Sequence, residues 1–497
     1  MSTYATLHAE GNQDSVIPVG KRLPLGWKAL PIGGVAKDCV RLSLGRAVMK
    51  QPAWLRVTVA LDVREAVRIE VLSAVSETVL GELDIRYASV FQPFQLWLSA
   101  AQAERLSYEG VLLRLRQGSS PIWVFIEGPS EAPLLLPHLR AEAVGEERMD
   151  PWEVMPQFLA TLSSLQPFGW LEGCVLDGLL DLERSRGGGR FREAAEAHLR
   201  MFFDEQGSLH YENPRSEPVD GAVYGIEGTL PFAALAQLYP QHPAIEQAIA
   251  FWLSEASEDG TIRDGTMLSA EGSYTIAYPM AIMAKLYHRQ DLVRLAIQQL
   301  KIRKELLFHG NDLYLRYHED GSRSFRNWSR AYAWYMLGLA RTLRELRKFR
   351  ELTKLPKEMH PASVSDLEQE LARIAQIAIN HQSEQGLWYV FVDEPHTRIE
   401  TSGSAAIAAA LAIGVELGIL SGNALDASLR ARQALSAYFT TDGILQGVAQ
   451  NNKGGEELQR GGYRIMSQMA TGLAAQLDSA LQRAMNKTSQ QEPLPEP

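Results

Sequence analysis

Residues 405–412 read Ala-Ala-Ile-Ala-Ala-Ala-Leu-Ala, and this stretch decides the fold class of the chain. Alanine is the strongest helix former, and its small side chain lets neighbouring helices approach closely. We therefore expect a helix that starts near residue 402 and packs its small-residue face tightly against other helices.

The chain after about residue 150 carries the same helical period throughout. Apolar residues at i, i+3, i+4 and i+7 predict roughly twelve helices. Paired helices in a long series are typical of a helical solenoid or a closed helical toroid. The expected helices start near residues 152, 171, 191, 227, 244, 272, 290, 328, 364, 402, 424 and 465.

The N-terminal part has the period of β-strands instead. Apolar and polar residues alternate along residues 54–63, as in a strand that is buried on one face. Short strands separated by Pro and Gly indicate an antiparallel sandwich or jelly roll. Further strands are expected at residues 67–72, 94–98, 111–116 and 122–127.

These two periods divide the chain into parts. The connector before the helices is Pro-rich and acidic, which is typical of a domain boundary. The last residues are polar and Pro-rich, which favours disorder. We expect a β-sandwich or jelly-roll accessory domain over 1–140, a linker over 141–150, a helical domain over 151–485 and a disordered tail over 486–497.

The composition of the 497 residues excludes several partners. The chain has 49 basic and 59 acidic residues, a net charge of -10, and no basic stripe, so we expect no nucleic-acid partner. It has no run of about 18 apolar residues, so we expect no membrane span. Cys39 and Cys174 lie far apart, which argues against a disulfide framework or a thiolate metal site.

The remaining broad expectations concern location and cofactors. The N-terminus lacks a basic region followed by an apolar one, which favours a cytoplasmic protein. A periplasmic or secreted protein whose signal peptide had been removed would look identical, so that alternative stays open. Neither a zinc motif nor a phosphate-binding or dinucleotide motif is present, so we expect no metal and no cofactor. Whether the chain forms a homo-oligomer stays open.

The loops between the predicted helices are rich in aromatic and acidic residues, including Tyr224, His318 and Trp388. Aromatic rings stack on the apolar face of a pyranose, and charged groups bind its hydroxyl and acid groups. The sequence therefore indicates an oligosaccharide as the partner. The alternative is that these rings only cap the ends of the helical barrel.

Two glutamates, Glu227 and Glu271, precede predicted helices, and each is followed by Gly. A helix N-terminus stabilises a carboxylate and lowers its pKa. A general acid needs the opposite, a pKa raised by burial or by a second carboxylate nearby. Both residues are candidate catalytic acids if they share one cleft, and ordinary first-turn acids if they do not.

Arg330 and Trp334 lie four residues apart, so a helix places them on one face. A guanidinium fork beside an indole suits a uronic acid, whose carboxylate binds Arg while its ring stacks on Trp. The alternative is a cation–π pair that closes the start of the helix.

Two longer segments resemble a known family. Asn327-Trp-Ser-Arg-Ala-Tyr-Ala-Trp-Tyr is similar to a Trp-Gly-Arg-x-x-Gly-Trp stretch of the unsaturated uronyl hydrolases of glycoside hydrolase families 105 and 88, which include the unsaturated rhamnogalacturonyl hydrolases. Residues 384–390 and 399–405 resemble that family's Gly-Leu-Trp-Tyr and Glu-Thr-Ser-Ala/Gly-Ser-Ala stretches. The similarity extends from about residue 165 to about residue 485.

The resemblance implies a mainly α chain built on an (α/α)6 toroid, preceded here by an antiparallel β-sandwich that the basic family fold lacks. It also implies hydration of the C4=C5 double bond of a terminal unsaturated uronic acid, with one carboxyl acting as acid and then as base. By this resemblance Glu271 is the acid/base and Glu227 its partner. The expected sugar-binding residues are Trp170, Tyr224, Tyr274, His318, Trp328, Arg330, Trp334 and Trp388.

The sequence departs from the family at the catalytic positions. The two family carboxylates are usually Asp, whereas both matches here are Glu, and an ungapped alignment places Tyr274 or Thr275 opposite the second acid. Three other functions therefore stay open. They are a conventional glucuronidase acting on saturated uronic acids, a non-catalytic sugar-binding toroid, and a polysaccharide lyase with Tyr274 or His318 as its base.

Overall fold

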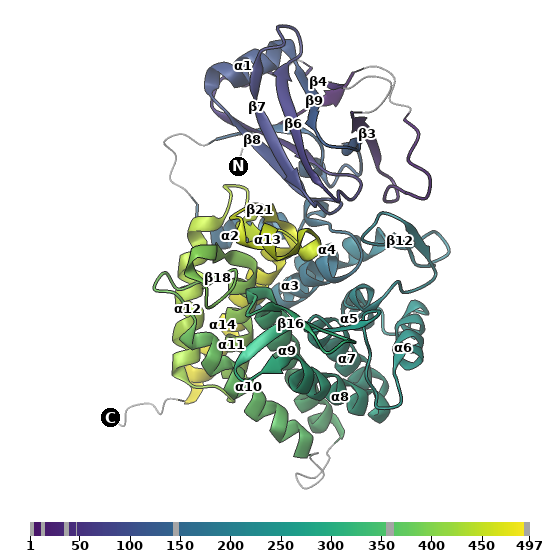
Figure 1. Cartoon of the computed structure of the whole chain (residues 1–497), viewed down its shortest axis with the longest axis vertical. Coiled ribbons are helices and arrows are strands. Elements are labelled where there is room, and N and C mark those ends of the chain that lie inside the picture. Colours follow the sequence, from purple (N-terminus) through teal and green to yellow (C-terminus); the bar gives the residue numbers. More distant parts are fainter. Residues whose placement is uncertain are drawn as a thin grey trace.

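The computed structural model describes residues 4–10, 15–33, 39–45, 47–142, 149–353 and 362–491. Figure 1 shows strands gathered in the N-terminal part of the chain and helices in the rest, with the two parts in contact. Residues 143–148 of the expected linker lie outside the described residues, as do residues 492–497 of the expected tail.

The N-terminal part, here called the β region, consists of antiparallel sheets. One sheet has the strand order β2-β4-β9-β6-β7, a second has the order β1-β11-β5-β8, and β3 pairs with β10. The strands are β1 (Tyr4–Thr6), β2 (His8–Ala9), β3 (Lys28–Ile32), β4 (Cys39–Ser43), β5 (Ala53–Thr58), β6 (Ala66–Ser73), β7 (Val79–Arg86), β8 (Pro93–Leu98), β9 (Val111–Gln117), β10 (Ile122–Glu127) and β11 (His138–Ala141).

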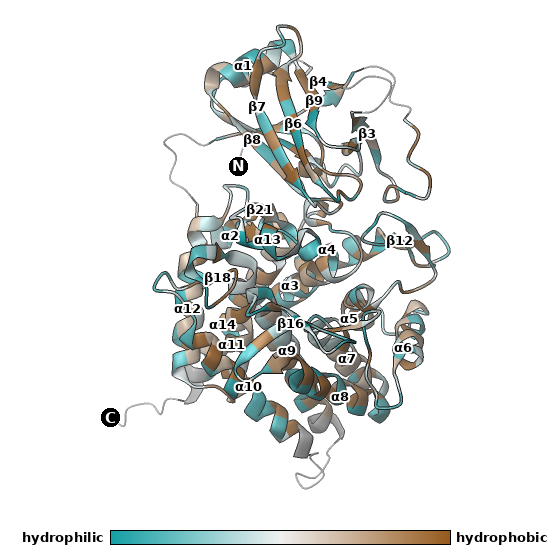
Figure 2. Ribbon diagram, viewed as in Figure 1, coloured by the Kyte–Doolittle hydropathy of each residue, from teal (hydrophilic) through white to brown (hydrophobic). Residues whose placement is uncertain are grey.

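Alternating side chains build the core of the β region. Val67, Ile69 and Val71 of β6 are buried, while the residues between them are partly exposed. This alternation is visible as hydrophobic and hydrophilic bands along β6 and β7 (Figure 2). Buried residues from both large sheets meet in one hydrophobic cluster, which includes Leu55 of β5 and Leu113 of β9. The strands expected at residues 67–72, 94–98, 111–116 and 122–127 are confirmed, whereas the first expected strand, over 54–63, ends at Thr58 in β5.

The sequence predicted neither the strands β1, β2, β3, β4, β7 and β11 nor the one α-helix described in the β region. Helix α1 (Ala100–Glu109) follows β8 and is closed by a capping box, in which the Ser99 hydroxyl accepts from the Gln102 backbone and the Gln102 side chain accepts from the Ser99 backbone. A capping box satisfies two backbone N–H groups at a helix start. This local signal was present in the sequence, but the short helix lies between strands.

The helical part contains a closed ring. Within the described residues, six inner helices each pack against the next, and the last packs back against the first. In ring order they are α3 (Trp170–Arg186), α5 (Pro231–Leu238), α7 (Tyr278–Tyr287), α9 (Ser329–Thr353), α11 (Thr401–Glu416) and α14 (Gln468–Gln491). Each has an outer partner, in the same order α4 (Arg190–Arg200), α6 (Ala244–Glu255), α8 (Gln290–Leu307), α10 (Ala362–Asn380), α12 (Gly422–Leu435) and α2 (Pro151–Leu159).

Small residues allow the inner helices to lie this close together. Residues 401–414 of α11 are all buried, which confirms the packed helix expected from its alanine run. At the contact of α3 with α14, a Cβ added to Gly178 would lie 2.6 Å from the Gly472 carbonyl oxygen. No larger residue fits there without moving a helix, because the neighbouring atom belongs to the backbone rather than to a flexible side chain.

Short strands and one further helix lie in the loops of the ring. They are β12 (His210–Glu212), β13 (Pro218–Asp220), β14 (Met267–Ser269), β15 (Phe308–His309), β16 (Asp312–His318), β17 (Arg323–Arg326), β18 (Trp388–Tyr389), β19 (Ile399–Glu400), β20 (Leu445–Ala449), β21 (Arg464–Ser467) and α13 (Gly455–Arg460). Loops that carry function are commonly held on such a rigid scaffold.

Buried charges and amides join the β region to the helical part. Arg56 of β5 donates to Asp442 at 2.6 Å, and Arg140 of β11 lies 3.4 Å from the same carboxylate. The amides of Gln450 and Asn451 donate to the carbonyls of the β7–β8 connection at 2.7 Å each. Breaking one partner of a buried ion pair is strongly destabilising, so this interface fixes the β region on one end of the ring.

The expected fold class is confirmed, and the expected end of the helical domain differs from the structure. The mainly helical C-terminal part and the antiparallel N-terminal strands are confirmed. Helix α14 continues to Gln491, beyond the expected domain end at residue 485, because residues 486–491 contain no Pro or Gly and Lys487 donates to the Glu416 carbonyl at 2.6 Å.

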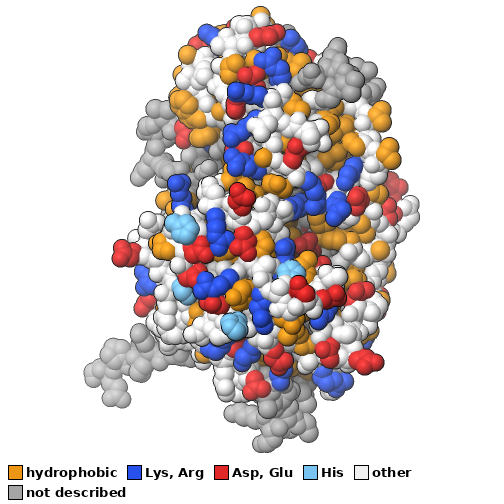
Figure 3. All heavy atoms as spheres, in the orientation of Figure 1, with side chains coloured by type: hydrophobic (Ala, Val, Ile, Leu, Met, Phe, Trp, Pro, Cys, Tyr) orange, Lys and Arg blue, Asp and Glu red, His pale blue; other side chains and the backbone are white. Residues whose placement is uncertain are grey.

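Over the described residues, no helix combines the length and apolar character that a membrane crossing requires. Basic and acidic side chains are interspersed on the face of the helical part seen in Figure 3.

Candidate active site

A cavity of about 390 Å³ lies between the ring and the β region. Its lining comes from the N-terminal ends of inner helices, from the loops that precede others, and from Arg64 and Ser89 of the β region. A concave site with convergent polar groups of this size is the common form of a ligand pocket.

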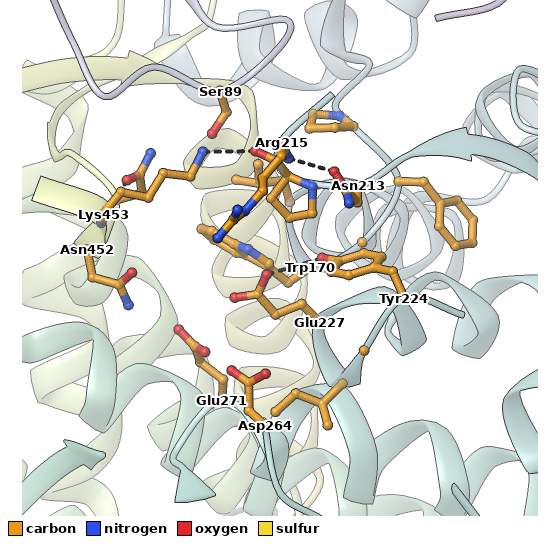
Figure 4. A pocket seen from close by; sticks show the side chains of 18 of the residues that line it. Ser89, Trp170, Asn213, Arg215, Tyr224, Glu227, Asp264, Glu271, Asn452 and Lys453 are labelled. Atoms are coloured by element: carbon orange, nitrogen blue, oxygen red, sulfur yellow. Dashed lines mark hydrogen bonds between the residues drawn. The ribbon is translucent and has the colours of Figure 1, made fainter. Parts of the chain in front are cut away.

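Three carboxylates line the cavity, and Figure 4 shows Glu227, Asp264 and Glu271 directed toward the same space. Glu227 lies in a 3-10 turn, Ile226–Thr229, directly before α5. Glu271 precedes the π-helical turn Ser273–Ala277 that leads into α7. The structure thus brings together the two glutamates that sequence reasoning selected, which are 44 positions apart, and adds an aspartate.

Packing explains the glycine that follows Glu271. A Cβ on Gly272 would lie 1.9 Å from Nη2 of Arg303, whose buried guanidinium donates to the Ser269 carbonyl at 2.9 Å. Glycine is needed here because a buried guanidinium occupies the space of a side chain. The backbone before α7 is thereby held against α8, which fixes the direction of Glu271.

The environment of the carboxylates raises their pKa values. Burial, followed by the negative charge of Glu227, raises the pKa of Glu271 to about 8. Burial and the charge of Asp264 raise the pKa of Glu227, and burial raises that of Asp264. The helix N-termini oppose this shift, but desolvation is the larger effect. Glu271 therefore holds a proton at neutral pH.

The two glutamates differ in their hydrogen bonding. The Tyr224 hydroxyl donates to Oε2 of Glu227 at 3.1 Å, which stabilises the ionised form and works against the rise in its pKa. Within the described residues no hydrogen bond to the Glu271 carboxyl is recorded. Two titratable groups whose surroundings push their pKa values apart are suited to divided acid and base roles.

A cation and three indoles form another side of the cavity. The Arg330 guanidinium carbon lies 4.6 Å from the centroid of the Trp328 ring, and its Nη2 donates to the Gln450 carbonyl. The rings of Trp170 and Trp334 meet edge to face at 5.4 Å. Arg330 and Trp334 both line the cavity, but Arg330 stacks on Trp328 rather than on Trp334. The buried Nε of Arg330 has no partner in the described part of the chain.

Three expected sugar-binding residues lie elsewhere. Tyr274 is buried among the inner helices, where its hydroxyl donates to Asp177 at 2.6 Å. His318 ends β16 and bonds to Ser324 at 3.0 Å. Trp388 is fully buried and donates to the Ala378 carbonyl at 2.7 Å. None of the three lines the cavity.

Sequence reasoning missed several residues of the cavity. Asp264 lies in an irregular loop before β14, and no helix start or motif marked it. Arg64, Arg215 and Lys453 come from three distant segments that only the folded chain brings together. The described residues contain no group of three or more His, Cys, Asp or Glu side chains arranged to hold a metal ion.

Comparison with solved structures shows the fold. The chain is similar to a possible member of the GH105 family from Salmonella enterica serovar Paratyphi A, with 17% identity over 72% of this chain and 98% of that one and a TM-score of 0.56. A GH105 enzyme from C. acetobutylicum gives 17% identity, 67% and 99% coverage and a TM-score of 0.56. An unsaturated glucuronyl hydrolase described as specific for heparin gives 12% identity, 68% and 95% coverage and a TM-score of 0.51.

Comparison with protein families identifies the helical part. No curated protein matches the chain. Residues 147–474, about two thirds of the sequence, match the family described as Glycosyl Hydrolase Family 88. The matched segment contains the first five inner helices, the start of α14 and the three carboxylates, so the resemblance drawn from the short motifs is confirmed. The chain belongs to glycosyl hydrolase family 88 and is a glycoside hydrolase.

Proposed function

We propose that this enzyme releases a terminal 4,5-unsaturated uronic acid from oligosaccharides by adding water to its C4=C5 double bond. The single observation that carries the proposal is that Glu271, with its pKa raised to about 8, shares one cavity with two further carboxylates and with Arg330. Membership of family 88 supports the same reaction class.

Glu271 is assigned as the acid and then the base. Its proton goes to C4 of the sugar, which leaves an oxocarbenium-like centre at C5 and an ionised Glu271. The carboxylate then takes a proton from a water molecule as the water oxygen bonds to C5. The resulting hemiketal opens, and the next sugar leaves. A general acid works best when its pKa lies near the working pH, which burial provides here.

Glu227 and Asp264 are assigned to the electrostatics of this step. Negative charge beside Glu271 keeps the proton on it before substrate reacts and stabilises positive charge developing at C5. The hydrogen bond from Tyr224 supports the ionised form of Glu227.

Arg330 and the indoles are assigned to the sugar ring. A guanidinium binds a uronate carboxylate with two parallel hydrogen bonds, and indole faces accept the apolar face of a pyranose. Arg330 lines the cavity together with Trp170, Trp328 and Trp334, and its buried Nε has no partner among the described residues. Terminal uronic acid is therefore the substrate class that this lining favours.

The proposed division of the chain follows from the same geometry. We take the ring with its outer helices as an (α/α)6 catalytic toroid that begins near residue 151, and the β region as an accessory sandwich domain. The closed succession of inner helices supports the first assignment, and the shared core of the two large sheets supports the second.

The reaction can be followed by the ultraviolet absorbance of the double bond. Incubation with unsaturated oligosaccharides made by polysaccharide lyases should abolish this absorbance, and Glu271→Gln should prevent the loss. Release of glucuronate from saturated oligosaccharides alone would establish a conventional glucuronidase. Appearance of absorbance on intact polysaccharide would establish a lyase, and sugar binding without any turnover would establish a non-catalytic protein.

A further inference from the structure

Three cationic side chains meet on one side of the cavity. They are Arg64 of the β region, Arg215 at the tip of the β12–β13 hairpin, and Lys453 in the turn before α13, and together they are called the cationic cluster. Nη2 of Arg64 and Nζ of Lys453 donate to the same carbonyl oxygen, that of Pro214, at 3.1 and 3.3 Å. Two positive groups thus lie within hydrogen-bonding reach of a single neutral acceptor.

The positive charge of the cationic cluster exceeds the negative charge of the carboxylates within ion-pair distance of it. Arg64 has a carboxylate partner in Asp62 at 2.8 Å. In the described parts of the chain, neither Arg215 nor Lys453 has a carboxylate within the 4.0 Å of an ion pair. Burial and the positive charges of Arg64 and Arg215 lower the pKa of Lys453 to about 8. The negative charges of Asp62 and Glu227 oppose this shift only in part. An anion placed among these groups would relieve this repulsion.

The β region holds the cluster in place. The Arg22 backbone N–H donates to the Ser216 carbonyl at 2.9 Å, and the Asp62 backbone N–H donates to the Ser216 hydroxyl at 2.9 Å. The Arg22 side chain also donates to Glu212 of β12 at 2.6 Å. The hairpin tip that carries Arg215 is therefore fixed from the β region, which supplies Arg64 as well.

The cluster and the group assigned to the uronate come from different elements of the cavity lining. Figure 4 shows Arg215 and Lys453 entering from the side opposite Glu271 and Asp264. The carboxylate of the terminal sugar is assigned to Arg330, on another element of the lining. The side chain of Arg64 is 45% exposed, so the cluster is open to a ligand.

We propose that Arg64, Arg215 and Lys453 bind a second anionic group, a carboxylate or a sulfate ester, on the sugar next to the terminal unsaturated uronic acid. The β region is then part of the substrate site and restricts the enzyme to oligosaccharides with negative charge on two adjacent sugars. This inference rests on the proposed function for the position of the first sugar.

The kinetic test compares three unsaturated disaccharides in the full-length enzyme. They differ only in the second sugar, which carries a sulfate ester, a carboxylate or no charge. We expect kcat/KM to be at least tenfold higher for a charged second sugar, and the better of the two charged substrates identifies the anion. Arg215→Ala and Arg64→Ala should each reduce this preference by roughly tenfold, the equivalent of about 1.4 kcal/mol. Equal kcat/KM values for all three in the unmodified enzyme would overturn the inference.

Matched variants separate this role from general electrostatics. Arg64→Lys should retain part of the preference, and Lys28→Ala, an exposed cation of the β region paired with Glu127, should retain all of it. If the cluster only balanced the cavity carboxylates, Arg215→Ala would reduce kcat/KM for the three substrates by one common factor and shift the pH profile. That result would also overturn the inference.

A binding measurement distinguishes failure of the inference from failure of the proposed function. Calorimetry with Glu271→Gln measures the affinity for the same three disaccharides without turnover. A charge preference in binding that disappears in Arg215→Ala, with no turnover by the unmodified enzyme, would reject the proposed reaction and keep the anion site. Turnover without any charge preference in binding or kinetics would keep the reaction and reject the anion site.

Discussion

Replacement of Glu271 by Gln should abolish turnover and at the same time stabilise the protein at high pH. The change keeps the shape of the side chain and removes its ability to ionise. Loss of a general acid typically costs about 10² to 10⁴ in rate. In the unmodified enzyme, kcat/KM should fall as the pH rises through about 8, because Glu271 then loses the proton that the reaction needs.

The effect on stability follows from the pKa of the buried carboxyl. Burial raises the pKa of Glu271 from 4.5 to about 8, so the folded state binds a proton that the unfolded state has lost between these pH values. At about 1.4 kcal/mol per pH unit, the native enzyme loses about 5 kcal/mol of folding free energy as the pH rises through this window. Glutamine does not ionise and avoids this loss.

Chemical denaturation at pH 5 and pH 9 measures this difference, and steady-state kinetics measures turnover. We expect similar free energies of unfolding for the native enzyme and Glu271→Gln at the lower pH, and a more stable variant at the higher pH. Glu384→Gln, at an exposed loop position, is the matched control and should change neither quantity. Unfolding curves that coincide at pH 9, or a variant that keeps more than a tenth of its turnover, would refute the assignment.

Three further changes have defined outcomes. Tyr224→Phe removes the hydroxyl that donates to Glu227 at 3.1 Å, so the acidic limb of the kcat/KM profile should move to higher pH and kcat should fall by about tenfold; an unchanged profile would show that this bond does not stabilise the ionised form. Tyr274→Phe removes a buried hydrogen bond to Asp177 at 2.6 Å and should lower the free energy of unfolding by about 1–3 kcal/mol, with KM unchanged since the residue is outside the cavity; a raised KM with full stability would return Tyr274 to the sugar site. Asp442→Ala removes the buried carboxylate that Arg56 and Arg140 of the β region share and should cost about 3–5 kcal/mol in denaturant unfolding; a loss below about 1 kcal/mol would mean that the β region is held by other contacts.

The order of the elements could be predicted from the sequence because it is encoded locally. The alternation along residues 54–58 and 67–71 gives strands, and the alanine run at residues 405–412 gives a buried helix. The glycine that follows Glu271 was visible in the sequence, but the Arg303 side chain that occupies the space beside it was not. Periodicity and capping depend only on residues close together in the chain, so they can be recognised from the sequence without knowledge of the fold.

The membership of the cavity could be predicted only in part. Glu227, Glu271, Arg330 and Trp334 were marked by their positions at helix starts or by their helical spacing, and all four line it. Trp388 carried the same aromatic signal in a loop but donates to a helix carbonyl and packs internally. Residue type and loop position do not distinguish a ring that faces a cavity from one that faces the core.

The sequence by itself determined the two kinds of secondary structure, their order, the family resemblance and the two glutamates as candidates. Only the tertiary structure decided that Asp264 joins these glutamates, that burial gives Glu271 a pKa of about 8, and that Arg64 reaches the cavity from the β region. The physical reason is that closure of the ring and docking of the sheets bring distant segments together and exclude water from between them. The spacing of residues along the chain specifies neither their distances in space nor the extent of their desolvation.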